Sequence, residues 1–256
     1  MFGGFGVALV TIEQLVLGAM VVFAASLIGG ISGFGYGLVS APLLLLIGLP
    51  LQTVVVVNLA LALTTRVSVV WRFRAAVVPR RVTVLVLGSV PGIVAGSIVL
   101  IEVRPQYLKV AVGCLVIVLA PLLMGRRPSQ PASTGIIPCL GAGFVGGLLG
   151  ATTSLNGVPA VLLLSRACVP PKIFIADLAA YFVASNAVAL ALLFASTHGA
   201  APDFALPFAC WLPGSLAANR LGTSLGPRLS GDLFRKLTLV LILVAGITTV
   251  TTGALA

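Results

Sequence analysis

Apolar runs of up to about 20 residues recur from one end of this chain to the other. A helix of that length spans the hydrocarbon core of a bilayer, and hydrophobic residues make up 59% of the chain against 8% charged. This combination excludes an ordinary soluble domain and leaves almost no residues for one. The sequence therefore predicts an all-α polytopic protein of the lipid bilayer. We place the runs at about 12–32, 38–49, 52–71, 82–101, 107–124, 135–150, 156–165, 172–194, 205–220 and 234–253.

One polar connection, at 125–134, separates the ten runs into two sets of five. We expect a first transmembrane repeat over 1–124, a cytoplasmic linker over 125–134 and a second transmembrane repeat over 135–256. The Pro-Gly pairs at 91–92 and 213–214 recur in the same order in the two halves, which favours a duplication.

Two glycine-rich segments strengthen the case for a duplication. The segments GGISGFGYGLVSAP (29–42) and GGLLGATTSLNGVP (146–159) align without a gap and interrupt apolar runs with residues that a continuous helix disfavours. Paired interruptions at matching places in two halves are the best sequence indication of a transporter's binding site. The identical pairs, each 117 positions apart, are Gly29/Gly146, Gly30/Gly147, Gly33/Gly150, Leu38/Leu155 and Pro42/Pro159.

The basic residues predict that the two halves have opposite orientations in the membrane. The connection after the third run carries four arginines and no acid, so it should be cytoplasmic, whereas the equivalent connection after the eighth run carries one histidine and one aspartate. An odd number of segments per half gives such inverted-topology repeats. The short runs at 38–49 and 156–165 could be broken helices or re-entrant hairpins whose glycine segments approach each other at mid-depth.

In these residues the chain resembles the TauE/SafE family, also called the 4-toluene sulfonate uptake permease family. The repeats of that family begin with a G-x-x-x-G-x-G-G-G-x-x-x-x-P pattern. Tyr36 replaces one glycine of the pattern in the first half, and in the second half Thr152, Thr153 and Ser154 stand where glycines are common. The residues of the first half that fit the pattern are Gly29, Gly33, Gly35, Gly37 and Pro42.

The resemblance implies a multi-pass carrier of the cell inner (plasma) membrane that moves small sulfur-containing anions, such as sulfite or a sulfonate, or related organic anions. We expect a secondary transporter that works by alternating access. A carboxylate or other organic-anion importer coupled to protons is the alternative, and a membrane-embedded enzyme or assembly partner without transport is an alternative of another class. The sequence indicates neither the direction of transport nor the oligomeric state.

An anion site needs hydrogen-bond donors, which backbone N–H groups at broken-helix N-termini, hydroxyls and amides supply. Such groups gather in the two glycine segments, although small residues at this spacing are also typical of close helix packing. Asn58 and Asn186, inside apolar runs, could line the path or bond across helices. The predicted substrate-binding residues are Ser32, Gly33, Gly35, Tyr36, Gly37, Asn58, Arg66, Thr152, Thr153, Ser154 and Asn156.

Two charged residues inside apolar runs are functional candidates with open interpretations. Arg66 could neutralise a substrate anion, or its side chain could extend to the cytoplasmic face, which is the interpretation we favour. Asp177 could carry a proton coupled to transport, or it could pair with Arg166 or Lys172, and here we favour the pairing.

The sequence contains no arrangement of residues that is typical of catalysis or of metal binding. The four cysteines are isolated, there is a single histidine, and no nucleotide-binding motif occurs. We therefore predict no enzyme activity, no catalytic residues, no metal and no cofactor. The net charge of +10 arises mostly in short connections, where it sets topology, so we expect no nucleic-acid partner. The expected partners are a small anionic substrate and, if transport is coupled, protons.

Overall fold

The computed structural model describes residues 10–104, 106–108, 110–111, 114, 134–196 and 204–225. Every regular element in these residues is a helix, which confirms the all-α prediction. The predicted run at 234–253 and most of the stretch from 107 to 134 lie outside the described residues. The helices are α1 (Ile12–Ser32), α2 (Tyr36–Leu46), α3 (Leu51–Phe73), the short 3-10 helix η1 (Arg74–Ala76), α4 (Pro79–Glu102), α6 (Ile136–Thr153), α7 (Gly157–Arg166), α8 (Pro171–Ser196) and α9 (Ala205–Leu225).

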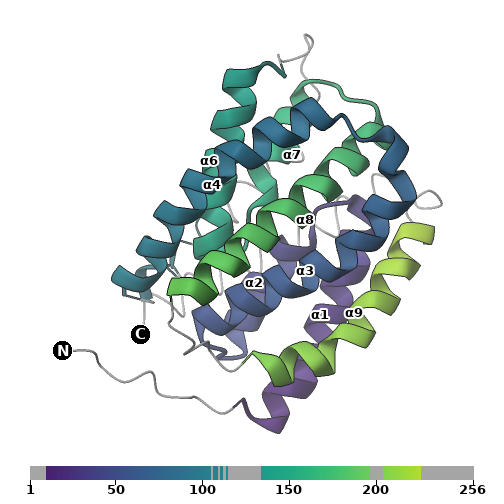
Figure 1. Ribbon diagram of the computed structural model, residues 1–256. Helices are drawn as coiled ribbons and strands as arrows, with labels where there is room; N and C mark the ends of the chain where they lie inside the picture. Colours follow the sequence, from purple (N-terminus) through teal and green to yellow (C-terminus); the bar gives the residue numbers. More distant parts are fainter. Residues whose placement is uncertain are drawn as a thin grey trace.

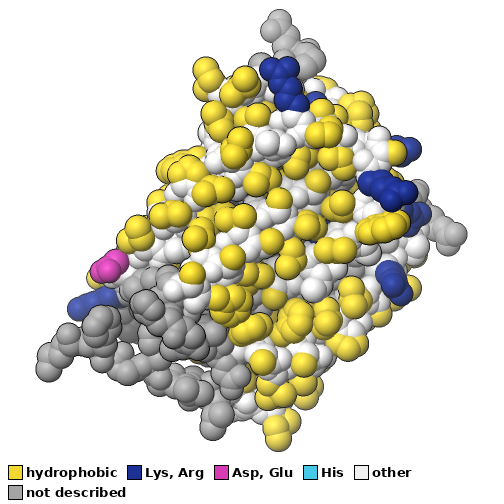
Figure 2. All heavy atoms as spheres, viewed as in Figure 1, with side chains coloured by type: hydrophobic (Ala, Val, Ile, Leu, Met, Phe, Trp, Pro, Cys, Tyr) yellow, Lys and Arg dark blue, Asp and Glu magenta, His cyan; other side chains and the backbone are white. Residues whose placement is uncertain are grey.

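Five of the described helical segments are long and apolar enough to cross a membrane. They are α1, α3 continued by η1, α4, α6 and α8, whereas α2 and α7 are shorter apolar helices. Hydrophobic side chains cover the face seen in Figure 2, and most of its Lys and Arg side chains gather toward one end. An apolar band with basic residues near helix ends is the surface expected of a multi-pass membrane protein, which this chain is.

The described helices pack mainly as three pairs. Helix α4 lies along α6, α1 lies along α9, and α3 packs against α8 in the middle of the molecule (Figure 1). If α1 to α4 correspond to α6 to α9, exchanging the predicted halves converts the α1–α9 pair into the α6–α4 pair. This pairing is the one that a two-fold relation between the halves would give. The boundaries of the repeats stay a prediction.

Glycines allow the outer two pairs to pack closely. A Cβ added at Gly147 of α6 would collide with Ser89 O and lie 2.9 Å from Ile93 N, both on α4. A Cβ added at Gly30 of α1 would lie 2.6 Å from Asn219 O on α9. Because Gly30 and Gly147 are aligned in the two glycine segments, the same position brings helix backbones together in both pairs.

Each short helix runs back alongside the long helix before it, so α1–α2 and α6–α7 are helical hairpins. Gln14 Nε2, near the start of α1, donates a hydrogen bond to Ile47 O just after α2 at 3.3 Å. Cys139 near the start of α6 and Leu164 near the end of α7 belong to one hydrophobic cluster. In each hairpin, the start of the first helix and the end of the second therefore lie close together, and the turn lies at the opposite end.

The breaks that form these two turns do not fall at aligned positions. Helix α1 ends at Ser32, after which Gly33 adopts a left-handed φ of 84°. Helix α6 continues to Thr153, and Ser154 takes the left-handed conformation with a φ of 59°. In the gap-free alignment the second break lies about four residues later, which is one helical turn. Gly33 enters the left-handed region without steric cost, whereas its counterpart Gly150 stays helical and two threonines continue α6.

Candidate functional site

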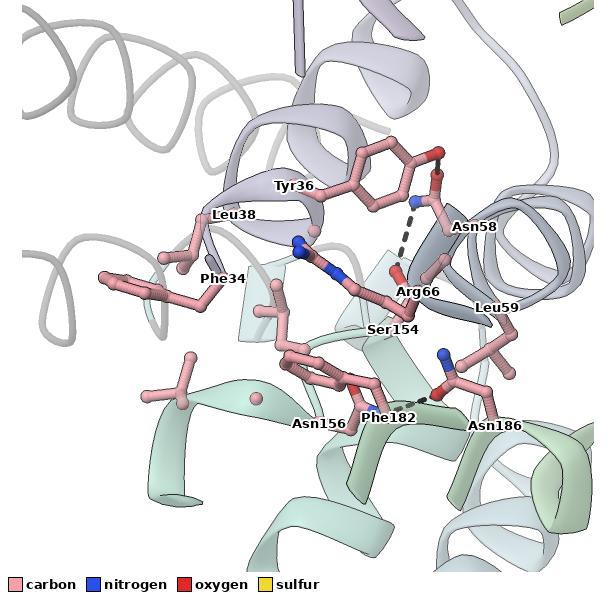
Figure 3. A pocket seen from close by; sticks show the side chains of 15 residues that line it. Phe34, Tyr36, Leu38, Asn58, Leu59, Arg66, Ser154, Asn156, Phe182 and Asn186 are labelled. Carbon is pink, nitrogen blue, oxygen red and sulfur yellow. Dashed lines mark hydrogen bonds between the residues drawn. The ribbon is translucent and has the colours of Figure 1, made fainter. Parts of the chain in front are cut away.

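The turns of the two hairpins meet inside the protein and border a small cavity. A Cβ added at Gly37 would lie 2.7 Å from Ser154 O, so the start of α2 touches the end of α6. The cavity has a volume of about 30 Å³, and side chains of α3 and α8 complete its walls (Figure 3). Six predicted substrate-binding residues line it, namely Tyr36, Gly37, Asn58, Arg66, Ser154 and Asn156.

Arg66 brings a buried positive charge to this cavity. The residue is only 4% exposed, its Nη2 donates to Gly29 O at 3.2 Å, and its Cζ lies 5.7 Å from the centre of the Phe182 ring. The guanidinium reaches from α3 into the space between Tyr36 and Phe182 (Figure 3). No carboxylate pairs with it among the residues that the structure describes. The favoured interpretation, extension to the cytoplasmic face, is therefore wrong, because the side chain is held inside the protein.

A chain of hydrogen bonds joins the first glycine segment to the second at the cavity wall. The Tyr36 hydroxyl donates to Asn58 Oδ1 at 3.0 Å, and Asn58 Nδ2 donates to Ser154 Oγ at 3.1 Å. Asn58 is 1% exposed, so both of its polar atoms are satisfied by protein groups instead of water. Asn58 thus bonds across elements, as one of its predicted alternatives has it, and it also lines the cavity, whereas a place on the transport path stays a prediction.

A second amide cluster leaves one hydrogen-bond donor free at the cavity. Asn156 Nδ2 donates to Ser185 Oγ at 3.2 Å and also to Asn186 Oδ1, which orients the Asn186 amide. Asn186 is fully buried and lines the cavity, yet its Nδ2 has no acceptor in the described part of the protein. Figure 3 shows this nitrogen turned away from Asn156. A buried donor without a partner is costly, so a ligand acceptor that reached this nitrogen from the cavity would be stabilised.

The N-terminal end of α2 adds backbone donors to the same wall. Gly37 and Leu38 lie in the first turn of α2 and line the cavity, and their backbone N–H groups have no acceptor within the described residues. Helix α7 also begins at the cavity, at Gly157. Free N–H groups and the positive end of the helix dipole favour an anion at such a place.

The other five predicted residues form the hairpin turns and do not line the cavity. The Ser32 hydroxyl accepts from Gly35 N at 3.0 Å and donates to a carbonyl of α1 at 2.8 Å. The Thr152 and Thr153 hydroxyls donate to carbonyls one turn earlier in α6, at 2.8 and 2.7 Å. These residues are Ser32, Gly33, Gly35, Thr152 and Thr153. Their hydroxyls are thus used by the backbone, and contact with a substrate stays a prediction for all five.

Phe182 lines the cavity and was not predicted from the sequence. It lies in α8, an apolar helix in which a phenylalanine is ordinary, so the sequence did not mark it as a site residue. Asn186 follows it by one helical turn, and its position inside an apolar run was the only indication that this face of α8 borders a polar site.

Asp177 lies apart from the cavity, where α8 meets the connection between α3 and α4. Its carboxylate accepts from Val78 N at 2.7 Å and from Arg81 Nη1 at 2.6 Å, and its side chain is fully buried. The predicted pairing with Arg166 or Lys172 is therefore wrong, because Arg81 in the first turn of α4 is the ion-pair partner of Asp177. A role of Asp177 in proton coupling stays a prediction.

The arrangement is suited to holding a small anion, because the cavity wall offers a guanidinium, an amide and backbone N–H groups. No acid, histidine or cysteine is among the described residues that line it. Elsewhere in the described residues, no three His, Cys, Asp or Glu side chains gather as a possible metal site. The lining groups can bind and orient an oxyanion, and none of them is an obvious nucleophile or general base.

Comparison with known proteins agrees with these features. The family model described as Sulfite exporter TauE/SafE matches residues 18–249, which include both glycine segments and every residue of the cavity wall. No curated protein and no solved structure matches the chain. Proteins of the matched family are membrane transporters and not enzymes. Because the match covers nearly the whole length, the chain belongs to the TauE/SafE sulfite exporter family.

Proposed function

We propose that this protein is a secondary transporter that carries a small sulfur oxyanion, with sulfite as the first candidate, across the cell inner membrane by alternating access. The observation that carries the proposal is Arg66, a buried cation beside a cavity, with no carboxylate partner among the described residues. A buried charge is costly unless it is paired, and an anionic substrate would supply the missing partner.

The other donors at the cavity support the same class of ligand. Asn186 Nδ2 and the backbone N–H groups of Gly37 and Leu38 have no acceptor in the described residues, and these three residues line the cavity together with Arg66. A deprotonated oxyanion presents only acceptors, so several donors around one small volume complement it. A neutral substrate would leave the charge of the guanidinium uncompensated, and a cationic substrate would be repelled by it.

The position of the cavity supports alternating access. It is bordered by both hairpin turns, and these turns belong to different predicted halves. A site between two inverted halves can be exposed to one side of the membrane or to the other when the halves rock against each other. The proposed movement requires no ATP-binding element in the chain.

The test is uptake of radiolabelled sulfite into proteoliposomes, with unlabelled sulfite, sulfonates and carboxylates as competitors. We expect saturable uptake that sulfur oxyanions compete for. Arg66→Gln should reduce it at least about 30-fold, because removing one partner of a buried charge pair costs about 2 kcal/mol or more. Arg66→Lys should retain part of the uptake, since it keeps the charge but loses the planar guanidinium.

Arg220→Gln is the matched control, because Arg220 is exposed on α9 and does not line the cavity. It should leave uptake within about twofold of the unaltered protein. Uptake that carboxylates block and sulfur oxyanions do not would contradict the proposal in favour of an organic-anion carrier. The same vesicles under an imposed pH gradient test proton coupling, for which Asp177→Asn is the informative variant.

A further inference from the structure

The wall of the cavity opposite Tyr36 is the ring of Phe182. Phe182 lies on α8, is 5% exposed and faces the Arg66 guanidinium, with 5.7 Å between Cζ of Arg66 and the ring centre. Figure 3 shows the ring below the guanidinium, beside Asn156. An anion bound to Arg66 in this cavity would lie next to the ring, so the ring position decides how far such a ligand can extend.

The ring has no room to retreat toward α7. A Cβ added at Gly157, the first residue of α7, would lie 2.5 Å from Cζ and 2.8 Å from Cε1 of Phe182. The ring therefore lies between the guanidinium of α3 and the backbone of α7, and it is packed closely against the latter. Gly157 is needed here for its missing side chain, because any larger residue would push the ring toward the cavity.

The resulting space is small and its remaining walls are largely apolar. A volume of about 30 Å³ has room for about two water molecules, since one water needs about 10–15 Å³ by this measure. The apolar part of the wall also includes Phe34, Leu38, Leu59, Ala62, Leu155 and Val158. A compact anion with one central atom fits such a space, whereas an organic sulfonate would need further room for its carbon substituent.

We infer that Phe182 determines substrate size in this transporter, restricting the site to compact inorganic oxyanions and excluding organic sulfonates. The inference rests on the proposed function and assigns the discrimination between inorganic oxyanions and organic sulfonates to one side chain. Sulfite and a sulfonate present the same three-oxygen group to Arg66 and the free donors. They differ in charge, because fully deprotonated sulfite is a dianion and a sulfonate a monoanion, and in the carbon substituent, which would have to share the small cavity with the Phe182 ring.

The test compares the inhibition constants of 4-toluenesulfonate and sulfite against labelled sulfite uptake. We expect sulfite to bind at least about tenfold more tightly than toluenesulfonate in the unaltered protein, and Phe182→Ala to reduce this preference about tenfold or more. Phe174→Ala removes another phenylalanine from α8 that does not line the cavity, so it should keep the original preference.

The close contact between Gly157 and the Phe182 ring allows a second test in the opposite direction. Gly157→Ala should push the ring into the cavity and reduce sulfite uptake about tenfold or more. Adding Phe182→Leu to Gly157→Ala should restore uptake, because the shorter side chain makes room for the new methyl group. A general folding defect at Gly157 would not be repaired in this way.

The outcomes separate the inference from the function on which it rests. If the unaltered protein takes up no sulfite, the proposed function fails. If it takes up sulfite but accepts toluenesulfonate equally well, or if Phe182→Ala keeps the original preference, the size restriction is overturned. If Phe182→Ala does not fold, the same preference measured by calorimetric binding to purified Phe182→Leu decides the question.

Discussion

Ser154 combines an unfavourable backbone conformation with a hydrogen bond that joins the two halves. It has a left-handed φ of 59°, and its Oγ accepts from Asn58 Nδ2. A left-handed conformation costs a residue with a Cβ about 1 kcal/mol that glycine avoids. The hydroxyl of Ser154 therefore comes with a cost in backbone energy that a glycine at this position would not have.

Two substitutions at this residue separate the backbone from the hydroxyl. Ser154→Ala keeps the strained backbone and leaves Asn58 Nδ2 without an acceptor, so the apparent melting temperature in detergent should fall. Ser154→Gly loses the same acceptor but relieves the strain, so it should be more stable than Ser154→Ala by about 1 kcal/mol. An alanine variant that melts at or above the glycine variant would contradict the left-handed assignment.

Arg66 illustrates what a sequence can predict about a single residue. A charged residue inside an apolar run marks a functional candidate, and Arg66 does line the cavity. The direction of the Arg66 side chain could not be predicted, because a long side chain can either extend to the membrane surface or stay buried. The direction is set by Gly29 and Phe182, which come from α1 and α8 and become neighbours only after the helices pack.

At the scale of the helix pair, two glycines of α6 have opposite surroundings. Gly147 packs directly on α4, where an added Cβ would collide with Ser89 O, whereas an added Cβ at Gly141 meets nothing within 4 Å. Alanine is a better helix former than glycine by about 0.5–1 kcal/mol at either position, so any difference between the two alanine variants comes from packing.

We therefore expect Gly147→Ala to destabilise the protein and Gly141→Ala to be neutral or slightly stabilising. The extra methyl group at Gly147 must push α4 and α6 apart, at a cost of about 1–3 kcal/mol for overpacking. Thermal unfolding in detergent, followed by size-exclusion chromatography of the heated samples, measures the difference. Equal melting of the two variants would mean that α4 and α6 do not pack through this glycine.

The same scale shows why the alignment of the glycine segments predicted the hairpins but not the position of their turns. Identical glycines at 33 and 150 suggested equivalent breaks, yet Gly150 remains helical and the second break is at Ser154. Glycine permits a left-handed conformation without requiring it. Which glycine uses that freedom depends on neighbours in space, such as the meeting of Gly37 with Ser154 O, and these do not appear in a local sequence pattern.

At the scale of the whole molecule, composition and run length predicted the membrane fold, because about 20 apolar residues per helix is a requirement of the bilayer itself. The helix pairing was not predicted in detail. Helix α1 packs along α9 and α4 along α6, so each half completes its packing with a helix of the other. Local periodicity contains no information on such long-range partners.

Among the described residues, one ion pair connects the predicted halves away from the cavity, and its two members differ in exposure. Arg81 of α4 bonds to Asp177 of α8, with the Arg81 side chain 17% exposed and the Asp177 side chain fully buried. Removing either partner should therefore have unequal effects. Arg81 can turn toward water if Asp177 is neutralised, whereas Asp177 would stay buried with Val78 N as its remaining donor.

We expect Arg81→Gln to lower the apparent melting temperature more than Asp177→Asn does, because an unpaired buried charge costs about 3–5 kcal/mol. The double variant should be more stable than Arg81→Gln alone, since it removes the stranded carboxylate. Thermal unfolding of the two single variants and the double variant in one detergent measures this double-mutant cycle. An Asp177→Asn variant that melts below Arg81→Gln, or a double variant that is no better than Arg81→Gln, would show that the pair does not hold α4 to α8 through a buried carboxylate.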